Sequence, residues 1–294
     1  MTPEDIQWPD LAPGATPVMH HGTLLGRPFE ELARIAALSG CSALTLPPNM
    51  ARDLAKGASG RSGKDAISIA ADYGIALTHL DPIMCWLPRW QPDPTNGALP
   101  LDIYDVPLDD VFRATDALGI GSISILGAFP PGSNSITEIM DNFGRLCERA
   151  ARHAVRCDIE FVPFWGIADL ATAWHILQQV NAPNTGIMFD FWHYCRGKRD
   201  DDLLRSIPGE RIAGVQFDDG WMTKPAERNI YEDTGAFRAP PGQGEMPIRE
   251  VTAILREMNA LKNIGPEILS AEIYAMSGEE VARTCRESMT WALS

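Results

Sequence analysis

Along the chain, short apolar segments alternate with longer segments in which apolar residues recur every three or four positions. Apolar runs of about four to eight residues predict buried strands, and the longer spacing predicts amphipathic helices. The predicted strands are Val18–Leu24, Ala43–Leu46, Ala76–Leu80, Ser122–Leu126, Arg156–Pro163, Gly186–Phe191, Ile212–Phe217 and Leu269–Ile273. The predicted helices are Pro28–Ser39, Lys64–Tyr73, Pro107–Leu118, Ser135–His153, Ile167–Val180, Asp201–Ile207, Ile248–Asn259 and Gly278–Ala292.

This alternation of strand and helix predicts an α/β fold, a single (β/α)8 TIM barrel. Residues 1–15 contain three prolines and little periodicity, so we expect an irregular lead-in followed by one barrel domain over residues 16–294. Two connections lack regular periodicity, Asp81–Asp105 after the third predicted strand and Asp218–Pro247 after the seventh. Loops of this length that follow barrel strands predict functional segments on the catalytic face.

A polar residue interrupts the apolar character of each of the last four predicted strands. These residues are Glu160, Asp190, Gln216 and Glu272. Buried polar groups need partners, and one shared divalent cation would serve all four. Oxygen donors favour Mn²⁺ or Mg²⁺, with Zn²⁺, Co²⁺ or Fe²⁺ as alternatives. Ordinary ion pairs for the glutamates, a helix cap for Asp190 and a loop hydrogen bond for Gln216 are the competing interpretations.

Such an ion would polarise a carbonyl or hydroxyl group of the substrate, acidify the neighbouring C–H and stabilise an enediolate. Glu160 and Glu272 are the predicted catalytic residues, acting as base and acid on the two faces of one carbon. This chemistry is that of an isomerase or epimerase acting on a keto-polyol or a related, ring-bearing substrate. Loss of a β-hydroxyl from the same intermediate would instead make the enzyme a dehydratase, and both outcomes stay open.

Four further residues are predicted to contact the substrate. His193 stands three residues beyond Asp190, and Arg238 precedes the segment PPGQG and can clamp an anionic or polyol group. Trp86 belongs to an aromatic-rich loop that favours a ring-bearing substrate, with packing of a lid or subunit interface as the alternative. His79, near the end of the third predicted strand, is either a residue of the pocket floor or a core histidine.

The order Glu, Asp-x-x-His, Gln, Glu, together with the Pro-Gly-x-Gly segment, resembles the xylose-isomerase-like TIM-barrel superfamily of sugar phosphate isomerases and epimerases. That superfamily includes inosose and 3-dehydroshikimate dehydratases. The resemblance is most specific in DIEFVPF, GIMFDFWHYCRG, RIAGVQFDD and ILSAEIY. It implies that Glu160, Asp190, Gln216 and Glu272 hold one divalent ion and that His193 and Arg238 contact the substrate.

One position departs from the epimerase pattern. Epimerases of the superfamily usually have His where this chain has Gln216, whereas Gln is more common in the dehydratase-like branches. A third hypothesis is that this chain is a subunit of a partner-dependent enzyme that cleaves carbon glycosides, as in another branch of the superfamily.

The amino-acid composition limits the kinds of partner that this protein is expected to bind. A formal net charge of −14 argues against a nucleic-acid or anionic-membrane surface. With six histidines, the chain also lacks the ligands that the zinc-dependent endonuclease branch requires. The six cysteines form no CxxC pair, which predicts reduced thiols, and neither a signal-peptide pattern nor a membrane-spanning run is present. We therefore expect a cytoplasmic enzyme with a small-molecule substrate, and homo-oligomer formation stays open.

Overall fold

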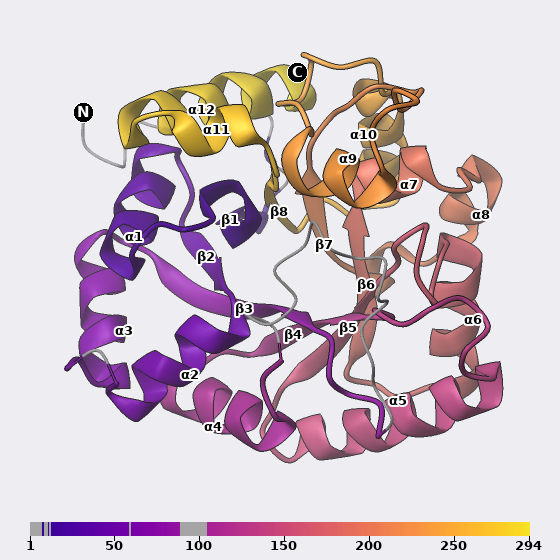
Figure 1. Cartoon of the computed structure of the whole chain (residues 1–294), viewed down its shortest axis with the longest axis horizontal. Helices are drawn as coiled ribbons and strands as arrows, with labels where there is room; N and C mark the ends of the chain where they lie inside the picture. Colours follow the sequence, from indigo (N-terminus) through magenta and orange to yellow (C-terminus); the bar gives the residue numbers. More distant parts are fainter. Residues whose placement is uncertain (1–7, 9–10, 12, 59, 89–104) are drawn as a thin grey trace.

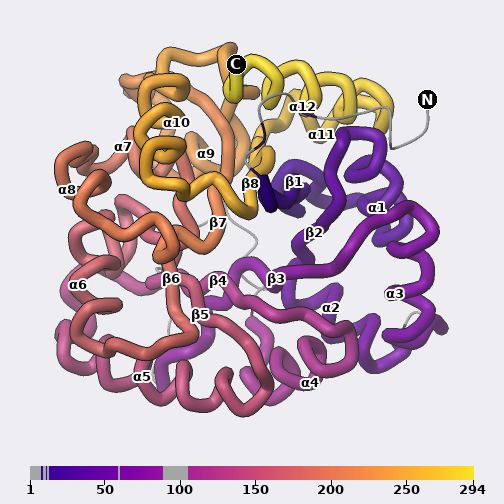
Figure 2. The backbone as a smooth tube through the Cα atoms, turned by 180° about the vertical axis from the view of Figure 1, so that it is seen from behind, coloured from indigo at the N-terminus to yellow at the C-terminus, as the bar shows by residue number. Residues whose placement is uncertain are grey.

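The computed structural model describes residues 8, 11, 13–58, 60–88 and 105–294. Eight parallel strands in this part of the chain close into a barrel in sequence order, which confirms the predicted fold class (Figures 1 and 2). The strands are β1 (Thr16–Met19), β2 (Ala43–Leu46), β3 (Ala76–Ile83), β4 (Ser122–Leu126), β5 (Arg156–Glu160), β6 (Thr185–Asp190), β7 (Ile212–Phe217) and β8 (Asn263–Pro266). Most of the predicted lead-in, and residues 89–104 of the predicted loop after the third strand, lie outside the described residues.

Helices surround the barrel, as Figure 1 shows. They are η2 (His21–Leu24), α1 (Phe29–Leu38), α2 (Pro48–Lys56), α3 (Gly63–Asp72), α4 (Leu108–Leu118), α5 (Ile136–Ala151), α6 (Leu170–Val180), α7 (Phe191–Arg196), α8 (Asp201–Ser206), η4 (Gly209–Arg211), α9 (Ile230–Ala236), α10 (Ile248–Glu257), α11 (Ala271–Ala275) and α12 (Gly278–Leu293). Their apolar faces pack on the strands, so both sides of the sheet are buried, as a parallel sheet requires. The short helices α2, α7 and α9 lie in segments for which the hydrophobic pattern predicts no helix.

The register between strands sets the level of the polar side chains. Leu126 of β4 pairs with Glu160 of β5, and Asp190 of β6 pairs with Gln216 of β7. Gln216 in turn pairs with Gly265 of β8, two residues before Glu267. Since all strands are parallel, these polar positions gather at one end of the barrel, the end at which TIM barrels carry their active sites.

The predicted eighth strand, Leu269–Ile273, is wrong. The strand lies earlier, at Asn263–Pro266, and the predicted segment runs into α11. The true strand contains Gly265 and Pro266, which are typical of turns and hide it from a search for apolar runs. Gly265 is required for packing, because a Cβ added there would lie 1.5 Å from the carbonyl oxygen of Val18 in β1.

The first predicted strand also ends too late, because β1 stops at Met19 and the helical turn η2 follows. The long connection after β7 is confirmed, and it contains α9.

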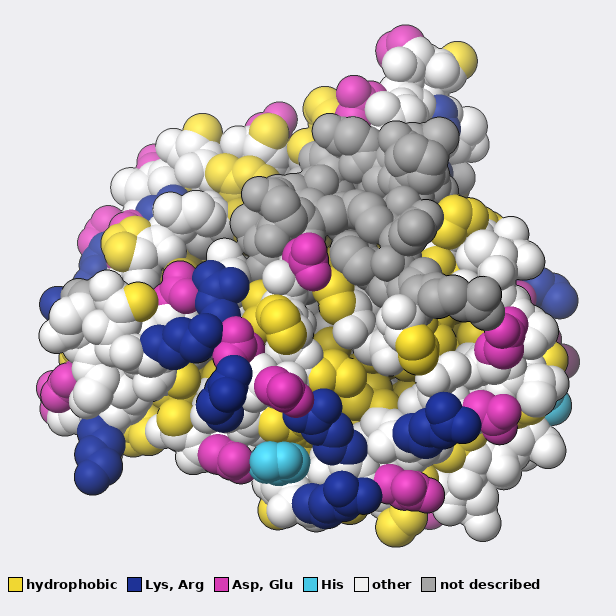
Figure 3. All heavy atoms as spheres, turned by 60° about the horizontal axis from the view of Figure 1, so that its bottom comes forward, with side chains coloured by type: hydrophobic (Ala, Val, Ile, Leu, Met, Phe, Trp, Pro, Cys, Tyr) yellow, Lys and Arg dark blue, Asp and Glu magenta, His cyan; other side chains and the backbone are white. Residues whose placement is uncertain are grey.

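On the face in Figure 3, side chains of both signs are interspersed. Among the described residues, ion pairs such as Lys56–Asp110, between α2 and α4, and Arg149–Asp109, between α5 and α4, join side chains of opposite charge. None of the helices in the described ranges has the length and apolar character needed to cross a membrane.

Candidate active site

The carboxyl ends of the last four strands each deliver one oxygen-bearing side chain. Glu160 ends β5, Asp190 ends β6, Gln216 lies near the end of β7, and Glu267 follows β8 directly. These four residues are 4%, 0%, 0% and 6% exposed. Three of the four are residues that the sequence predicts as metal ligands, and the structure brings them to one end of the barrel.

The amide of Gln216 has a defined orientation. Its Nε2 donates a hydrogen bond of 2.9 Å to Oδ2 of Asp81 in β3, across the barrel. An ionised carboxylate only accepts hydrogen bonds, so Asp81 fixes which end of the amide is the nitrogen. Oδ2 of Asp81 accepts the hydrogen bond from the amide nitrogen, and Oε1 of Gln216 is left buried without a hydrogen-bond partner in the described part of the chain. A buried acceptor in this state is suited to a cation.

Arg238 lies in the loop between α9 and α10, and its side chain reaches the carboxyl ends of β6 and β7. Its Nη1 donates to Asp190 Oδ2 at 2.6 Å and also to Asp218 Oδ2, and its Nε donates to the carbonyl of Thr234 in α9. Burial opposes the charge of this guanidinium, but the two carboxylates raise its pKa above the ordinary value. Arg238 lines the cavity, and its donors are engaged by the protein, so the predicted substrate contact stays a prediction.

His193 lies beside Glu160. The backbone N–H of His193 donates to Asp190 Oδ1 at 2.7 Å, since Asp190 caps the start of α7. The same residue's Nε2 stands 3.3 Å from Oε1 of Glu160. Burial lowers the pKa of His193 to about 4, so the imidazole is neutral near pH 7. It is 4% exposed and lines the cavity, which is the location predicted for it.

The site holds more buried carboxyl groups than cationic groups. Its carboxyl groups are Asp81, Glu160, Asp190, Asp218 and Glu267, and the one guanidinium in contact with them is that of Arg238 among the described residues. Burial, followed by the neighbouring carboxylates, raises the pKa of Glu160 and Glu267 well above their usual range. Although burial opposes ionisation of Asp190 too, Arg238 and His193 keep its pKa below the ordinary value. Such an excess of carboxylates is the chemistry of a cation site.

Two groups of side chains have the spacing that a metal ion needs. Ligand atoms of Glu160, Asp190 and His193 all lie within 4.8 Å of one another, and the same holds for His20, Asp81 and Glu267. Glu267, Asp81 and His20 are missing from the predicted ligand set. Asp81 could have been found from its position at the end of a strand, and Glu267 from the true extent of β8.

Glu272, predicted as a metal ligand and catalytic residue, is not in this site. It is exposed in the first turn of α11, beyond the end of β8. The error follows directly from the misplaced strand, because the sequence pattern made Glu272 the acid of the eighth strand. Glu267 takes that place, five residues earlier in the chain.

Two predicted substrate contacts also lie elsewhere. The ring of Trp86 packs on Phe129 and Phe143, and its Nε1 donates to the carbonyl of Leu126 at 2.8 Å, which makes it a core residue. His79 sits two residues before Asp81 in β3, and its Nδ1 lies 2.9 Å from the hydroxyl of Thr78. Neither residue lines the cavity. The competing interpretation, in which Trp86 and His79 serve packing and not substrate binding, therefore fits their positions better.

The cavity above the carboxylates has one polar and one apolar side. The apolar side is formed by residues from the ends of β3, β4 and β5 and from their loops: Pro82, Met84, Leu126, Val162, Phe164 and Trp165. The polar side carries Asp81, Glu160, His193, Arg238 and Glu267. Trp165 is 2% exposed, and its indole N–H has no hydrogen-bond partner in the described residues. The geometry thus suits a molecule with an oxygen-rich edge and an apolar face.

Comparisons with known proteins agree with this architecture. A family model described as a xylose isomerase-like TIM barrel matches residues 32–292. A 3-dehydroshikimate dehydratase from Pseudomonas putida is 30% identical over 224 residues, which is 72% of this chain and 32% of the relative. An inosose isomerase from Bacillus licheniformis is 27% identical over 151 residues, 51% of this chain and 52% of the relative. The matches thus span about a third and about half of these two relatives.

Among solved structures, the IolI protein with a bound zinc atom has a TM-score of 0.78 at 18% identity. It covers 95% of this chain, and this chain covers 98% of it. At such low identity the likeness establishes the fold alone. Because the family model spans most of the chain, the chain belongs to the xylose isomerase-like TIM-barrel family, as its motifs predict.

Proposed function

We propose that this protein is a divalent-metal-dependent enzyme that removes a proton from a carbon next to a carbonyl or hydroxyl group of a small molecule. The observation that carries the proposal is the set of four buried oxygen donors at consecutive strand ends, Glu160, Asp190, Gln216 and Glu267. The excess of carboxylates over cationic groups around them supports it.

The proposed ligands of the ion are these four residues. The buried Oε1 of Gln216, which has no hydrogen-bond partner in the described chain, supports a cation at this position. All-oxygen donors suit Mn²⁺ or Mg²⁺, and Zn²⁺, Co²⁺ or Fe²⁺ are the alternatives. When bound, the ion would supply positive charge that stabilises a substrate oxygen as negative charge develops on it.

Glu160 is the proposed base. Its side chain is buried at the end of β5 and lines the cavity, where it can take a proton from the substrate. Nε2 of His193 lies 3.3 Å from Oε1 of Glu160 and 3.3 Å from Nη2 of Arg238. Because a guanidinium only donates, the neutral ring accepts from Arg238 at Nε2, and its Nδ1–H is left to donate. Glu267, from β8, is the proposed partner that handles a proton on the other side of the reacting carbon, which is the role an epimerase or isomerase needs.

The apolar side of the cavity supports a substrate with a hydrophobic face. Met84, Phe164 and Trp165 would lie against carbon atoms, and the free indole N–H of Trp165 is able to donate to one substrate oxygen. We therefore propose a small ring-bearing ketone or keto-polyol, with its oxygens toward Glu160 and Glu267.

A dehydratase is the second candidate. The relative that is 30% identical is named 3-dehydroshikimate dehydratase. The resemblance of the motifs also points this way, because Gln at position 216 is more common in the dehydratase-like branches. In that reaction the same base removes the proton, the electron pair of the C–H bond forms a C=C bond, and the C–O bond of the neighbouring carbon breaks. The hydroxyl group leaves as water after it takes up a proton from a carboxyl group of the site, a role that Glu267 could fill. The choice between the two reactions depends on the substrate that fits the apolar side.

The test begins with metal content and solvent exchange. We expect the purified chain, loaded with Mn²⁺, to exchange deuterium from D2O into an inosose or 3-dehydroshikimate, read by NMR. Loss of water from 3-dehydroshikimate would give an aromatic ring and a rise in ultraviolet absorbance, which would select the dehydratase.

The matched pair Glu267→Gln and Glu272→Gln tests the site. We expect Glu267→Gln to lose at least tenfold in Mn²⁺ affinity and to lose exchange, and Glu272→Gln to behave like the wild type. Equal metal affinity in the two variants, or a wild type that binds no divalent ion, would refute the proposed function.

A further inference from the structure

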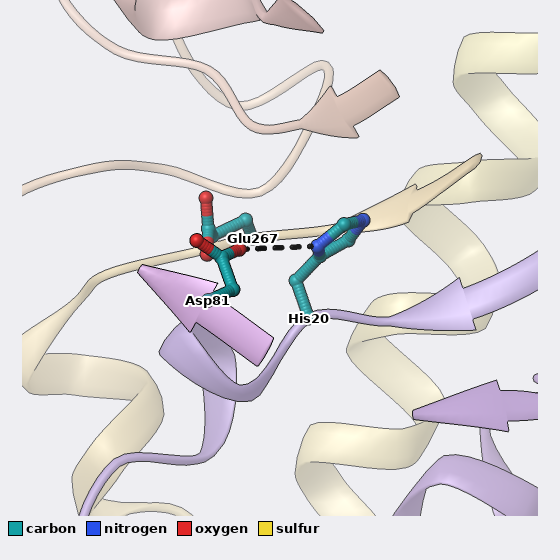
Figure 4. A group of neighbouring side chains, drawn as sticks. All are labelled: His20, Asp81 and Glu267. Carbon is teal, nitrogen blue, oxygen red and sulfur yellow. Dashed lines mark ion pairs between the residues drawn. The ribbon is translucent and has the colours of Figure 1, made fainter. Parts of the chain in front are cut away.

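The barrel mouth holds a second cluster on the side opposite Glu160 and His193. Figure 4 shows His20, Asp81 and Glu267 together, with the imidazole facing the two carboxylates. His20 follows β1, Asp81 lies in β3, and Glu267 follows β8. Their ligand atoms lie within 4.8 Å of one another, as do those of the separate group formed by Glu160, Asp190 and His193.

His20 is a buried imidazole without a hydrogen bond. It is 1% exposed, and within the described chain neither Nδ1 nor Nε2 has a hydrogen-bond partner. Nδ1 faces Oδ2 of Asp81 at 3.8 Å, whereas a charge-assisted hydrogen bond would bring the two atoms to about 2.8 Å. Two ligands that each lie about 2.0–2.2 Å from one cation stand roughly 3–3.5 Å apart, so a small inward movement fits a shared ion.

The surrounding charges favour a cation here. Arg238 is hydrogen-bonded to Asp190 and Asp218, and its charge also acts on Glu267. No hydrogen bond joins its guanidinium to Asp81 within the described chain. Asp81 accepts from Gln216, but each carboxylate oxygen has two lone pairs and can bind a cation as well.

Gly22 gives the carboxylate of Glu267 its room. A Cβ at Gly22 would lie 2.9 Å from Oε1 and 3.1 Å from Cγ of Glu267. The chain therefore has no side chain at the point where Glu267 enters the cluster.

We propose that His20, Asp81 and Glu267 form a second divalent-cation site, and that Glu267 bridges it to the site of the proposed function. This inference rests on the proposed function for the shared ligand. One nitrogen and two carboxylates suit Zn²⁺, Co²⁺ or Mn²⁺ better than Mg²⁺. Two ions that share a carboxylate commonly stand about 3.5–4 Å apart, a spacing that lets them bind two adjacent oxygens of one substrate.

The experiment counts ions on the full chain. Protein stripped with a chelator is titrated with Co²⁺, and bound ions are counted by native mass spectrometry and elemental analysis. We expect two ions per wild-type chain, one in His20→Phe, which keeps a ring but removes both nitrogens, and one in Asp190→Asn, which weakens the other site. His79→Phe, a buried histidine of the same barrel outside the cluster, is the matched control and should keep two.

A second readout uses Mn²⁺. Electron paramagnetic resonance should show two spin-coupled ions in the wild type and an isolated Mn²⁺ signal in His20→Phe. A wild type with a single ion that persists in His20→Phe and is lost in Asp190→Asn overturns the second site and leaves the proposed function intact. A wild type that binds no ion overturns both. Two ions in His20→Phe also overturn the inference, and a wild type with a single ion overturns it even where a variant fails to fold.

Discussion

Asp219 holds the segment that carries Arg238, and its removal gives a prediction with a calculable size. Asp219 follows β7 and is 1% exposed. Its Oδ1 accepts from the backbone N–H groups of Gly220 and Met246 at 2.7 and 3.0 Å, and its Oδ2 accepts from those of Gly242 and Gly244 at 2.9 and 3.1 Å. This carboxylate therefore replaces secondary structure as the hydrogen-bond partner of a loop.

The substitution Asp219→Asn keeps the size of the side chain and removes one acceptor. Whichever way the amide turns, two N–H groups lose their acceptor and face an NH2 group. A hydrogen bond to a charged acceptor contributes about 1.5–3 kcal/mol, so the loss of two predicts a decrease of about 3–6 kcal/mol in the free energy of unfolding. The side chain has little room to move away, because a Cβ at Gly244 would already lie 2.3 Å from Oδ1 of Asp219.

Urea unfolding followed by circular dichroism measures the effect. Asp202→Asn is the matched control, since Asp202 is fully exposed and its one ion pair spans 4.0 Å, and we expect it to change stability by less than about 0.5 kcal/mol. An Asp219→Asn variant within about 1 kcal/mol of the wild type would refute the assignment of this carboxylate as the anchor of the loop.

Three further predictions test packing and protonation. Gly265→Ala should lower the free energy of unfolding by more than about 3 kcal/mol, since the new Cβ would meet the Val18 carbonyl at 1.5 Å; Gly121→Ala, with no atom within 4 Å, is the control in the same thermal unfolding assay. Trp86→Phe should cost about 1–3 kcal/mol more than Trp165→Phe, because only Trp86 loses a hydrogen bond, to Leu126, while both lose buried ring area. Trp165→Phe should in addition raise KM, and equal stability losses would contradict these two locations. Burial and the hydrogen bond from its Sγ to Asp105 raise the pKa of Cys85 to about 12, and only the thiolate reacts, so alkylation of Cys85 should rise with pH up to that value instead of levelling off near pH 9. Asp105→Asn should shift this profile to lower pH, and a plateau near pH 9 in the wild type, read by peptide mass spectrometry, would contradict the assignment.

The sequence predicted the barrel because its strands are buried on both faces and therefore appear as continuous apolar runs. The runs ending in Glu160, Asp190 and Gln216 also placed those residues at strand ends, since a polar residue that ends such a run is easy to recognise. The eighth strand failed for the opposite reason. Its close contact with β1 requires Gly265, and a four-residue strand that ends in Gly-Pro has no apolar run to detect. For this reason the sequence pattern predicts Glu272, and not Glu267, as the carboxylate at the end of the eighth strand.

Asp81 shows a different limit. Its neighbours in the sequence mark it only as an acid before a proline, but in the fold it receives the amide of Gln216, a residue 135 positions away. An imidazole ligand has a ring whose second nitrogen must be held by a neighbour, and an amide ligand has two ends that must be told apart. A carboxylate across the barrel solves the second problem, because it can only accept. In this chain Asp81 is the acid that orients the Gln216 amide, and this pairing becomes visible only when β3 and β7 are seen facing each other.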